Sequence, residues 1–280
     1  MANNSNELPL SVAIVVPVYK KFTHLEKTEL KLIEQIKSVF TDRDILFILP
    51  ESLEADWKQN SGFRTIIFND SYFKDKLSYS KLLCRKEFYE SFSDFSYIQI
   101  IQTDCWVFED KLDYFSKLGL DYIGAPWMVG GFDGKPREQL WKVGNGGFSL
   151  RKVKTFKSII KKIESSPKGK IPVFKFKQMT LKGILKNFGF RNNLEHYIKQ
   201  SPGEDIFWSI YVPHVFSTEQ FKIADPITAA SYSFEVLPEF LFREVTKGSL
   251  PMGCHNWKNN DPEFWQKFIF QFKSSSTILT

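Results

Sequence analysis

Residues 97–108 read YIQIIQTDCWVF, an apolar run of β-branched and aromatic residues that ends in a polar tripeptide. The pattern predicts a buried strand followed at once by Gln102, Thr103 and Asp104. Ligands of open α/β sheets bind just beyond the carboxyl ends of strands. A carboxylate at such an end can hold Mg²⁺ or Mn²⁺ through its hard oxygen atoms, but it can equally cap the next turn. These residues alone therefore leave Asp104 with two interpretations.

The chain before this strand alternates between strand-like and helix-like patterns. The expected strands are residues 11–17, 44–50 and 63–68, and the expected helices are residues 20–40, 51–60 and 77–92. Strands that alternate with helices predict βαβ units and a mainly parallel sheet. In such an α/β fold a nucleotide would lie across the carboxyl ends of the strands, near residues 17–19 and 102–104.

The second half of the chain is less regular and richer in turns. The expected elements are a short strand at 121–127, a loop at 130–136, a glycine-dense loop and strand at 143–151, and helices at 152–163, from Gly203 and at 262–272. Residues 167–186 are basic and irregular, with no recognisable chemistry. The basic stretch 152–186 is typical of a solvated face, with a membrane surface or a phosphate-rich partner as the alternative.

The composition excludes several classes of protein. The chain has 280 residues, a net charge of +6 and a pI near 9.0, and its lysines are spread out instead of forming a nucleic-acid-binding tail. Its three cysteines have no CxxC spacing, which indicates reduced thiols and neither disulfides nor a zinc site. The chain shows no signal-peptide pattern and no bilayer-spanning apolar run. We expect a cytoplasmic protein that binds no nucleic acid and at most associates peripherally with the cytoplasmic face of a membrane.

Three common signatures are absent from the sequence. No GxGxxG follows the first expected strand, and GxxxxGK[ST] occurs nowhere, so dinucleotide-binding and Walker-type sites lose their usual support. The chain also lacks the GxSxG turn of Ser-His-Asp hydrolases, which argues against a hydrolase of that type.

Five short motifs nevertheless occur in an informative order. They are VPVY at residues 16–19, QTD at 102–104, GNGGFSLR at 144–151, GED at 203–205 and GCH at 253–255. The ordered set resembles the GT-A class of nucleotide-sugar glycosyltransferases, and it looks closest to a small microbial family catalogued as a domain of unknown function. The resemblance extends over most of residues 11–260, and no single motif carries it alone.

The resemblance implies a GT-A-like, Rossmann-like fold: a mixed, mainly parallel sheet flanked by helices in a single domain. We expect this domain at residues 11–272, with a nucleotide-binding half at 11–110 and a donor-sugar and acceptor half at 111–260. Residues 1–10 are expected to be disordered, and residues 273–280 are expected to form a C-terminal tail.

In the GT-A class the end of the first strand holds the base and ribose of the nucleotide, and a DxD motif holds its diphosphate through a metal. The residues that the resemblance assigns to the nucleotide are Pro17, Val18, Tyr19, Gln102, Thr103 and Asp104. From the residues alone, Lys81 and Arg85 lie one turn apart on an expected helix and could neutralise the diphosphate. A solvated surface explains these two residues as well.

The DxD motif departs here from the family pattern, because Gln102 replaces its first acid. Asp104 would then supply the only negative charge at the metal, so metal affinity would be weaker or would depend more on the diphosphate. A C-terminal histidine often completes the coordination in this class, and His255 matches that position. Imidazole suits Mn²⁺ better than Mg²⁺, so the resemblance implies a divalent cation held by Asp104 and His255. The alternative is a loop histidine bonded only to backbone.

The glycine-dense loop also has two interpretations. Its glycines could form only a tight turn and a bulge, or they could let the backbone approach a sugar closely. In the GT-A class the matching segment lines the donor-sugar and acceptor pocket, which implies such roles for Asn145, Gly146 and Gly147. Three tryptophans are candidates for stacking against a sugar, although each alone is more often part of a core: Trp127, Trp141 and Trp208.

Two adjacent acids, Glu204 and Asp205, stand at an expected helix start. They could simply interact with the helix dipole. By resemblance, Asp205 is the base that takes the proton of the acceptor hydroxyl, and Glu204 holds acceptor hydroxyls or acts as the base itself.

We therefore predict a metal-dependent glycosyltransferase of the hexosyltransferase type, acting with inversion. It would move a sugar from a nucleotide-diphosphate donor, with a UDP-sugar as first choice, to a hydroxyl of a glycan or glycolipid such as a surface polysaccharide. One alternative is a nucleotidyltransferase, which would ordinarily need glycines that residues 17–22 lack. Another is a non-catalytic protein that binds a carbohydrate or a nucleotide sugar, which Gln102 leaves open.

Overall fold

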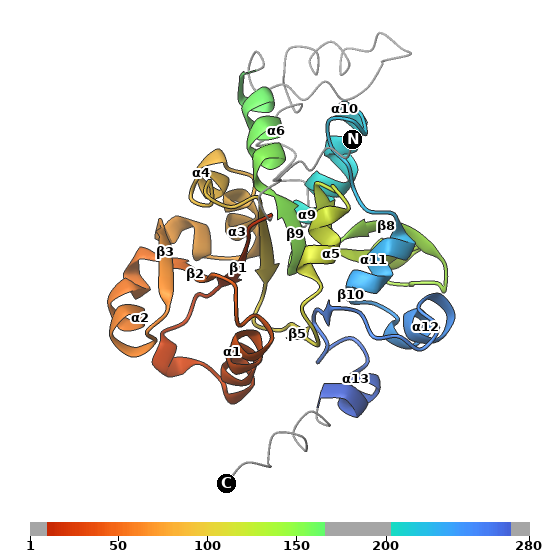
Figure 1. Cartoon of the computed structure of the whole chain (residues 1–280), viewed down its shortest axis with the longest axis horizontal. Coiled ribbons are helices and arrows are strands. Elements are labelled where there is room, and N and C mark those ends of the chain that lie inside the picture. Colours follow the sequence, from red (N-terminus) through yellow and green to blue (C-terminus); the bar gives the residue numbers. More distant parts are fainter. Residues whose placement is uncertain (1–9, 166–202, 270–280) are drawn as a thin grey trace, which may run out of the picture.

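A six-stranded sheet forms the centre of the molecule. The computed structural model describes residues 10–165 and 203–269, and its strands follow the order β3-β2-β1-β4-β9-β6 (Figure 1). These strands are β1 (Val12–Pro17), β2 (Ile45–Pro50), β3 (Arg64–Phe68), β4 (Tyr97–Ile101), β6 (Tyr122–Ile123) and β9 (Phe148–Lys152). The pairs β1–β2, β1–β4 and β2–β3 are parallel, whereas β9 runs antiparallel to both of its neighbours. The predicted α/β fold with a mixed, mainly parallel sheet is confirmed.

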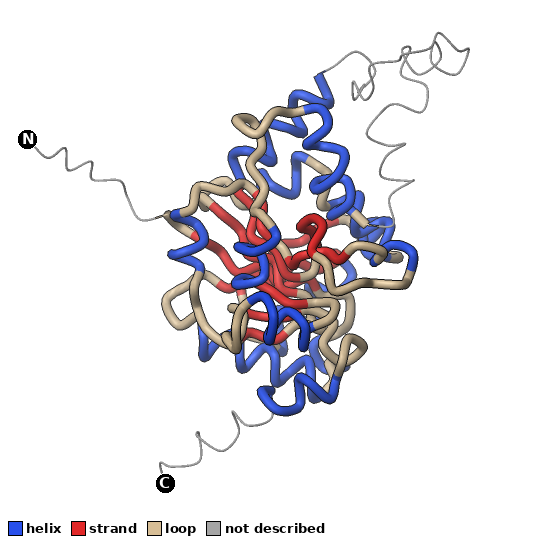
Figure 2. The backbone as a smooth tube through the Cα atoms, turned by 90° about the vertical axis from the view of Figure 1, so that its right-hand side faces the viewer, coloured by secondary structure: helices blue, strands red, loops and turns tan. Residues whose placement is uncertain are grey.

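Helices cover both faces of the sheet (Figure 2). In the first half they are α1 (Lys27–Val39), α2 (Glu54–Asn60), α3 (Lys76–Leu82) and α4 (Lys86–Glu90). In the second half they are α5 (Leu112–Lys117), α6 (Val153–Ser165), α9 (Glu204–Ile206), α10 (Val212–Val215), α11 (Pro226–Tyr232), α12 (Pro238–Phe240) and α13 (Pro262–Ile269). Because both faces are covered, β1 and β4 are buried throughout, which explains their unbroken apolar runs. None of the helices in the described ranges is long and apolar enough to cross a membrane.

Two small sheets hold the remaining strands. One consists of β5 (Trp106–Val107), β10 (Ser233–Phe234) and β11 (Gly253–Cys254), in the order β10-β11-β5. Within it, β11 is parallel to β10 and antiparallel to β5. The other is a hairpin of β7 (Ala125–Met128) and β8 (Leu140–Gly144). The strands of the first small sheet have two residues each, too short for an alternating pattern to reveal them.

Two of the expected helices differ from the observed ones. The helix expected at 20–40 begins at Lys27, after a separate helical turn at Phe22–His24. The helix expected at 77–92 is two helices, because the chain is extended at Arg85 before α4 begins. At this break the Leu83 carbonyl accepts hydrogen bonds from the Tyr89 hydroxyl at 2.9 Å and from the Trp208 indole at 3.3 Å. Side chains from other parts of the fold thus donate to a carbonyl that, in a continuous helix, would accept a backbone hydrogen bond.

Some predictions fall outside the described residues. They are the disorder of residues 1–9, the irregular basic stretch at 167–186, the last residues of the expected helix at 262–272, and the tail at 273–280. Leu10 is described and exposed. The division into a nucleotide-binding half and a sugar-binding half stays a prediction.

Candidate active site

A cavity of about 380 Å³ opens where β1 and β4 end, within the range of roughly 300–1,000 Å³ that is usual for ligand pockets. Residues after both strands form one part of its wall, and residues 73–79, around the start of α3, form the other. The predicted nucleotide-binding residues that line it are Pro17, Tyr19, Gln102, Thr103 and Asp104. The two parallel strands therefore bring together the two motifs that the sequence had placed 85 residues apart.

Two predicted nucleotide-binding residues do not line this cavity. Val18 is 1% exposed and belongs to the core, because its backbone N–H continues the sheet by donating to the Ile48 carbonyl at 2.9 Å. Lys81 lies in the last turn of α3. This helix ends before Arg85, so the two cations do not share a helix. The cavity is instead lined by Lys74 and Lys76, on either side of the residue that caps α3. Sequence reasoning missed both lysines, although two lysines at a helix start are a usable signal for anion binding.

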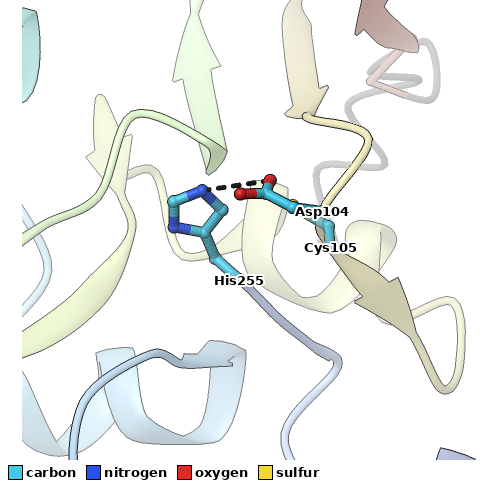
Figure 3. A group of neighbouring side chains, drawn as sticks. All are labelled: Asp104, Cys105 and His255. Carbon is cyan, nitrogen blue, oxygen red and sulfur yellow. Dashed lines mark ion pairs between the residues drawn. The ribbon is translucent and has the colours of Figure 1, made fainter. Parts of the chain in front are cut away.

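Asp104 and His255 meet at this end of the sheet (Figure 3). Asp104 Oδ1 lies 3.3 Å from His255 Nε2. The contact follows from the small sheet, since β5 begins just after Asp104, β11 ends just before His255, and the two strands pair antiparallel. The structure therefore brings together the two residues predicted to bind a metal.

Glu235 completes this arrangement and was not found from the sequence. It follows β10 directly, and the parallel pairing of β10 with β11 sets it beside His255, with Oε1 2.9 Å from Nδ1. Burial alone would lower the pKa of His255, but hydrogen bonds and charges from Asp104 and Glu235 outweigh it and raise the pKa to about 10. Burial would raise the pKa of Asp104, and His255 lowers it by a larger amount. No local pattern marks Glu235, because its role depends on a two-residue strand.

Asp104, Cys105 and His255 form a group whose potential ligand atoms lie within 4.8 Å of one another. The Cys105 thiol is buried and donates to the Gly147 carbonyl at 3.2 Å. Burial raises its pKa well above the ordinary value, so the sulfur stays protonated and is a poor ligand for a hard cation. Asp104 offers a carboxylate oxygen, and His255, whose pKa of about 10 keeps it protonated at neutral pH, offers Nε2 as a donor atom once that nitrogen has lost its proton.

The glycine loop passes directly over these side chains. A Cβ atom at Gly147 would lie 2.3 Å from His255 Nε2 and 2.8 Å from Gln102 Oε1. A Cβ atom at Gly146 would lie 2.1 Å from Glu204 Oε1. Close approach therefore requires glycine at both positions, whichever ligand the loop contacts.

Asn145 shapes the loop from within. It has a φ of 77°, in the left-handed region, and its Oδ1 accepts hydrogen bonds from the backbone of Gly147 at 2.9 Å and Phe148 at 3.3 Å. Its backbone N–H donates to Asp205 Oδ2 at 3.2 Å. The loop thereby connects two parts of the site: Gly147 lies against His255, a candidate metal ligand, and Asn145 bonds to Asp205, the predicted base.

Asp205 stands at the start of α9. Its Oδ1 accepts a hydrogen bond from the Ile206 backbone at 2.9 Å. Burial, and then the charges of Glu204 and Glu235, raise the pKa of Asp205 to about 6. A carboxylate with such a pKa is ionised at neutral pH and still basic enough to take a proton.

Glu204 has a different environment from Asp205. Its Oε1 pairs with Nη2 of Arg151 at 2.7 Å, and the side chains are 7% and 0% exposed. Arg151 also donates to the Tyr89 hydroxyl, the Ser149 hydroxyl and the Gly146 carbonyl. The predicted contact of Glu204 with an acceptor competes with this buried ion pair. Arg151, to which the sequence assigned no role, ties the glycine loop to the helix that carries Asp205.

Two buried side-chain atoms in this region, the Tyr79 hydroxyl and Asn145 Nδ2, have no hydrogen-bond partner among the described residues, and buried Asp104 Oδ1 is held by its ion pair with His255. Buried polar atoms are nearly always paired in folded proteins. Tyr79 and Asp104 line the cavity, and Asn145 belongs to the loop beside it. The grouping of the two unpaired atoms at one site indicates that they are available to a ligand.

The predicted tryptophans fall into two sets. Trp208 is fully buried and packs on Phe156, with ring centroids 4.2 Å apart, so the prediction that it stacks on a sugar is wrong. Trp127 and Trp141 lie on the β7–β8 hairpin, and Trp141 is 43% exposed.

The sequence model of the family described as "Protein of unknown function (DUF5672)" matches residues 62–255. The chain belongs to this family. The match takes in β3, β4, the glycine loop, Asp205, Glu235 and His255. No curated protein matches the chain significantly.

Solved structures show the fold to which this DUF5672 protein is similar. The crystal structure of an active-site mutant of LgtC has a TM-score of 0.50 at 13% identity, covering 96% of this chain and 97% of that one. A second LgtC structure, described as the galactosyltransferase in complex with donor and acceptor sugar analogues, has a TM-score of 0.49 at 12% identity. The similarity covers 96% of this chain and 97% of that one. The apo form of mouse xyloside xylosyltransferase 1 has a TM-score of 0.47 at 12% identity, covering 88% and 97%. At this identity the first of these similarities establishes a GT-A-type fold and nothing about activity.

Proposed function

We propose that this DUF5672 protein is a metal-dependent glycosyltransferase that moves a sugar from a nucleotide-diphosphate donor to a hydroxyl of a glycan or glycolipid. The observation that carries the proposal is the meeting of remote segments at one site. The cavity at the ends of β1 and β4, the pair Asp104–His255 and the carboxylate of Asp205 are joined through residues 145–147. The fold that the chain shares with LgtC, named as a galactosyltransferase, is compatible with this chemistry.

The residues at the site fit a divalent cation. Asp104 Oδ1 is a buried carboxylate oxygen that forms an ion pair with the imidazole nitrogen His255 Nε2 at 3.3 Å. The hydrogen bond between Glu235 and the other ring nitrogen is the arrangement that orients metal-binding histidines. Asp104 and His255 would hold the ion once His255 has lost the proton that its pKa of about 10 retains at neutral pH, and this mixed oxygen and nitrogen set favours Mn²⁺ over Mg²⁺. When bound, the ion would stabilise the negative charge of the departing diphosphate.

The nucleotide would occupy the cavity. Pro17 and Tyr19 would contact the base and ribose at the end of β1, where Tyr19 is 63% exposed and offers a ring face. Lys74 and Lys76 would balance the charge of the diphosphate, taking the role that the sequence had given to Lys81. A UDP-sugar is the proposed donor.

Asp205 would act as the general base. Its carboxylate would accept the proton of the acceptor hydroxyl while that oxygen forms a bond to the anomeric carbon and the bond to the diphosphate oxygen breaks. A direct attack of this kind inverts the configuration of the anomeric carbon. The pKa of Asp205, about 6, supports the assignment, since a general base works best with a pKa near the operating pH.

Thermal-shift measurements with UDP, GDP and CMP, each with and without Mn²⁺, test the proposal. We expect one nucleotide to raise the Tm of the protein, and to do so more in the presence of Mn²⁺. Asp104→Ala should remove the dependence on Mn²⁺ without unfolding the protein. The proposal fails if no nucleotide raises the Tm. Binding of a nucleotide without transfer from any UDP-sugar would instead support a non-catalytic binding protein.

A further inference from the structure

The β7–β8 hairpin carries a cluster of three aromatic side chains, Trp127, Phe132 and Trp141, named here the aromatic platform. The two indole rings are stacked with centroids 6.3 Å apart, and Phe132 meets them edge-on at 5.0 Å and 5.7 Å. Phe132 is 55% exposed and Trp141 is 43% exposed. Large aromatic rings that stay exposed while contacting one another mark an interaction site more often than scattered surface residues do.

Local backbone features bring these three rings together. Trp127 pairs with Lys142, whereas the next residue, Met128, pairs with Leu140, so Trp141 is the extra residue of a β-bulge. A bulge changes the direction of a side chain, and here it allows Trp141 to stack on Trp127. Phe132 belongs to a helical turn bounded by Gly130 and Gly134, both with positive φ, at 77° and 68°. The platform thus depends on a bulge and two left-handed glycines.

The platform is continuous with the candidate active site. A Cβ atom at Gly144 would lie 1.8 Å from Cζ2 of Trp127, so this ring lies directly over the glycine. The next residue, Asn145, donates its backbone N–H to Asp205. At the other end of the loop, Gly147 contacts His255. The loop therefore has the platform at one end, the proposed base in the middle and the proposed metal ligands at the other.

We propose that the aromatic platform binds the acceptor, a glycan whose pyranose ring stacks its apolar C–H face on Trp127 and Trp141. The inference rests on the proposed function, because it takes Asp205 as the group that the acceptor hydroxyl must reach. Aromatic faces suit the apolar side of a pyranose. Lys142 Nζ lies over the Trp141 ring, 5.7 Å from its centre, and provides a hydrogen-bond donor beside the platform.

A membrane surface is the main competing ligand for exposed aromatic rings. Residues 129–142 contain three basic residues, Lys135, Arg137 and Lys142, but also two acidic ones, Asp133 and Glu138. This mixed charge is a poor match for anionic lipid, which selects clusters of basic residues. Continuity with Asp205 also requires a ligand that carries hydroxyl groups, so the observations favour a glycan.

Saturation-transfer NMR with methyl α- and β-glycosides of glucose, galactose, mannose and N-acetylglucosamine tests the inference. Irradiation of the aromatic protons should saturate the ring protons of at least one glycoside in the wild-type protein. Trp141→Ala and Phe132→Ala should weaken that binding by about tenfold. Tyr114→Ala is the matched control, because Tyr114 is 59% exposed on α5, and it should leave the binding unchanged.

The outcomes separate this inference from the proposed function. The nucleotide thermal shift, measured on the same variants, reports whether the donor cavity is intact. If nucleotide raises the Tm but no glycoside binds, or if Trp141→Ala binds glycosides like the wild type, the platform assignment is wrong. If Trp141→Ala abolishes sedimentation with phosphatidylglycerol vesicles, the platform is a membrane contact. If no nucleotide raises the Tm of any variant, the proposed function itself fails.

Discussion

The region proposed to bind the nucleotide, called here the nucleotide side, and the region proposed to carry out catalysis, called the catalytic side, are built in different ways. On the nucleotide side, β1 to β4 have five or six residues each and pair in parallel within about 100 residues of sequence. On the catalytic side, β5, β10 and β11 have two residues each, yet their pairing brings Asp104, Glu235 and His255 together. The first region depends on local pattern, and the second depends on contacts between remote segments. We therefore expect some substitutions on the catalytic side to change the transfer rate or metal binding while the protein still folds.

The largest expected effect is on catalysis. Asp205→Asn should lower the transfer rate by about 10²–10⁴-fold, because the amide cannot accept the proton of the acceptor hydroxyl. The nucleotide thermal shift should persist, since Asp205 lies outside the set of residues that line the cavity. Asp113→Asn, a substitution of an exposed carboxylate on α5, is the control and should leave the rate unchanged. Loss of nucleotide binding in Asp205→Asn would mean that the residue holds the donor instead.

A second comparison sets a buried ion pair against an exposed one. Arg151→Met should lower the free energy of unfolding by about 3–5 kcal/mol, because it leaves Glu204 charged and buried without a partner. Arg243→Met removes the exposed pair with Glu239 and should cost about 1 kcal/mol or less. Urea denaturation of both variants measures the difference. If Arg151→Met and Arg243→Met lower the free energy of unfolding equally, the Arg151 network does not hold the glycine loop and α9 together.

The contact that orients His255 should have a smaller effect, confined to the metal. Glu235→Gln should weaken Mn²⁺ binding by about 10–100-fold, because the ring loses the carboxylate that orients it. Calorimetric titration of Mn²⁺ in the presence of UDP measures this loss. Glu239→Gln, at an exposed position, should bind Mn²⁺ like the wild type. If both variants bind Mn²⁺ equally well, Glu235 has no part in the metal site.

The smallest effect is a stability difference that depends on pH. Asp205 has its pKa raised from 3.8 to about 6, so the folded state retains a proton that the unfolded state loses between these values. The free energy of unfolding should therefore fall as pH rises through this window. It should stay at the lower value above pH 6, where Asp205 is ionised in both states. Asp205→Asn removes this titration, so the loss of stability between pH 3.5 and pH 7.5 should be smaller than in the wild type by roughly 1–3 kcal/mol. A variant whose stability changes with pH as much as that of the wild type over this range would contradict the shift.

The residues that sequence reasoning placed well and those it missed differ in a consistent way. Pro17, Tyr19 and the tripeptide at 102–104 follow long buried strands, and all five line the cavity. Val18 was misplaced because its side chain is part of the core and its backbone N–H bonds to Ile48. Lys81 was misplaced because it lies in the last turn of α3, whereas residues around the start of that helix line the cavity. Glu235 and Arg151 were missed because their partners are distant in the sequence.

The sequence by itself determined the order of elements, the parallel sheet and the positions of the motifs, because hydrophobic periodicity and turn residues act over a few neighbouring positions. The tertiary structure alone decided which side chains share a site. It paired Glu235 with His255 and Glu204 with Arg151. It also buried Trp208 and left Trp141 exposed. These outcomes depend on strand pairing and packing between segments 20 to 153 residues apart, which no local pattern records.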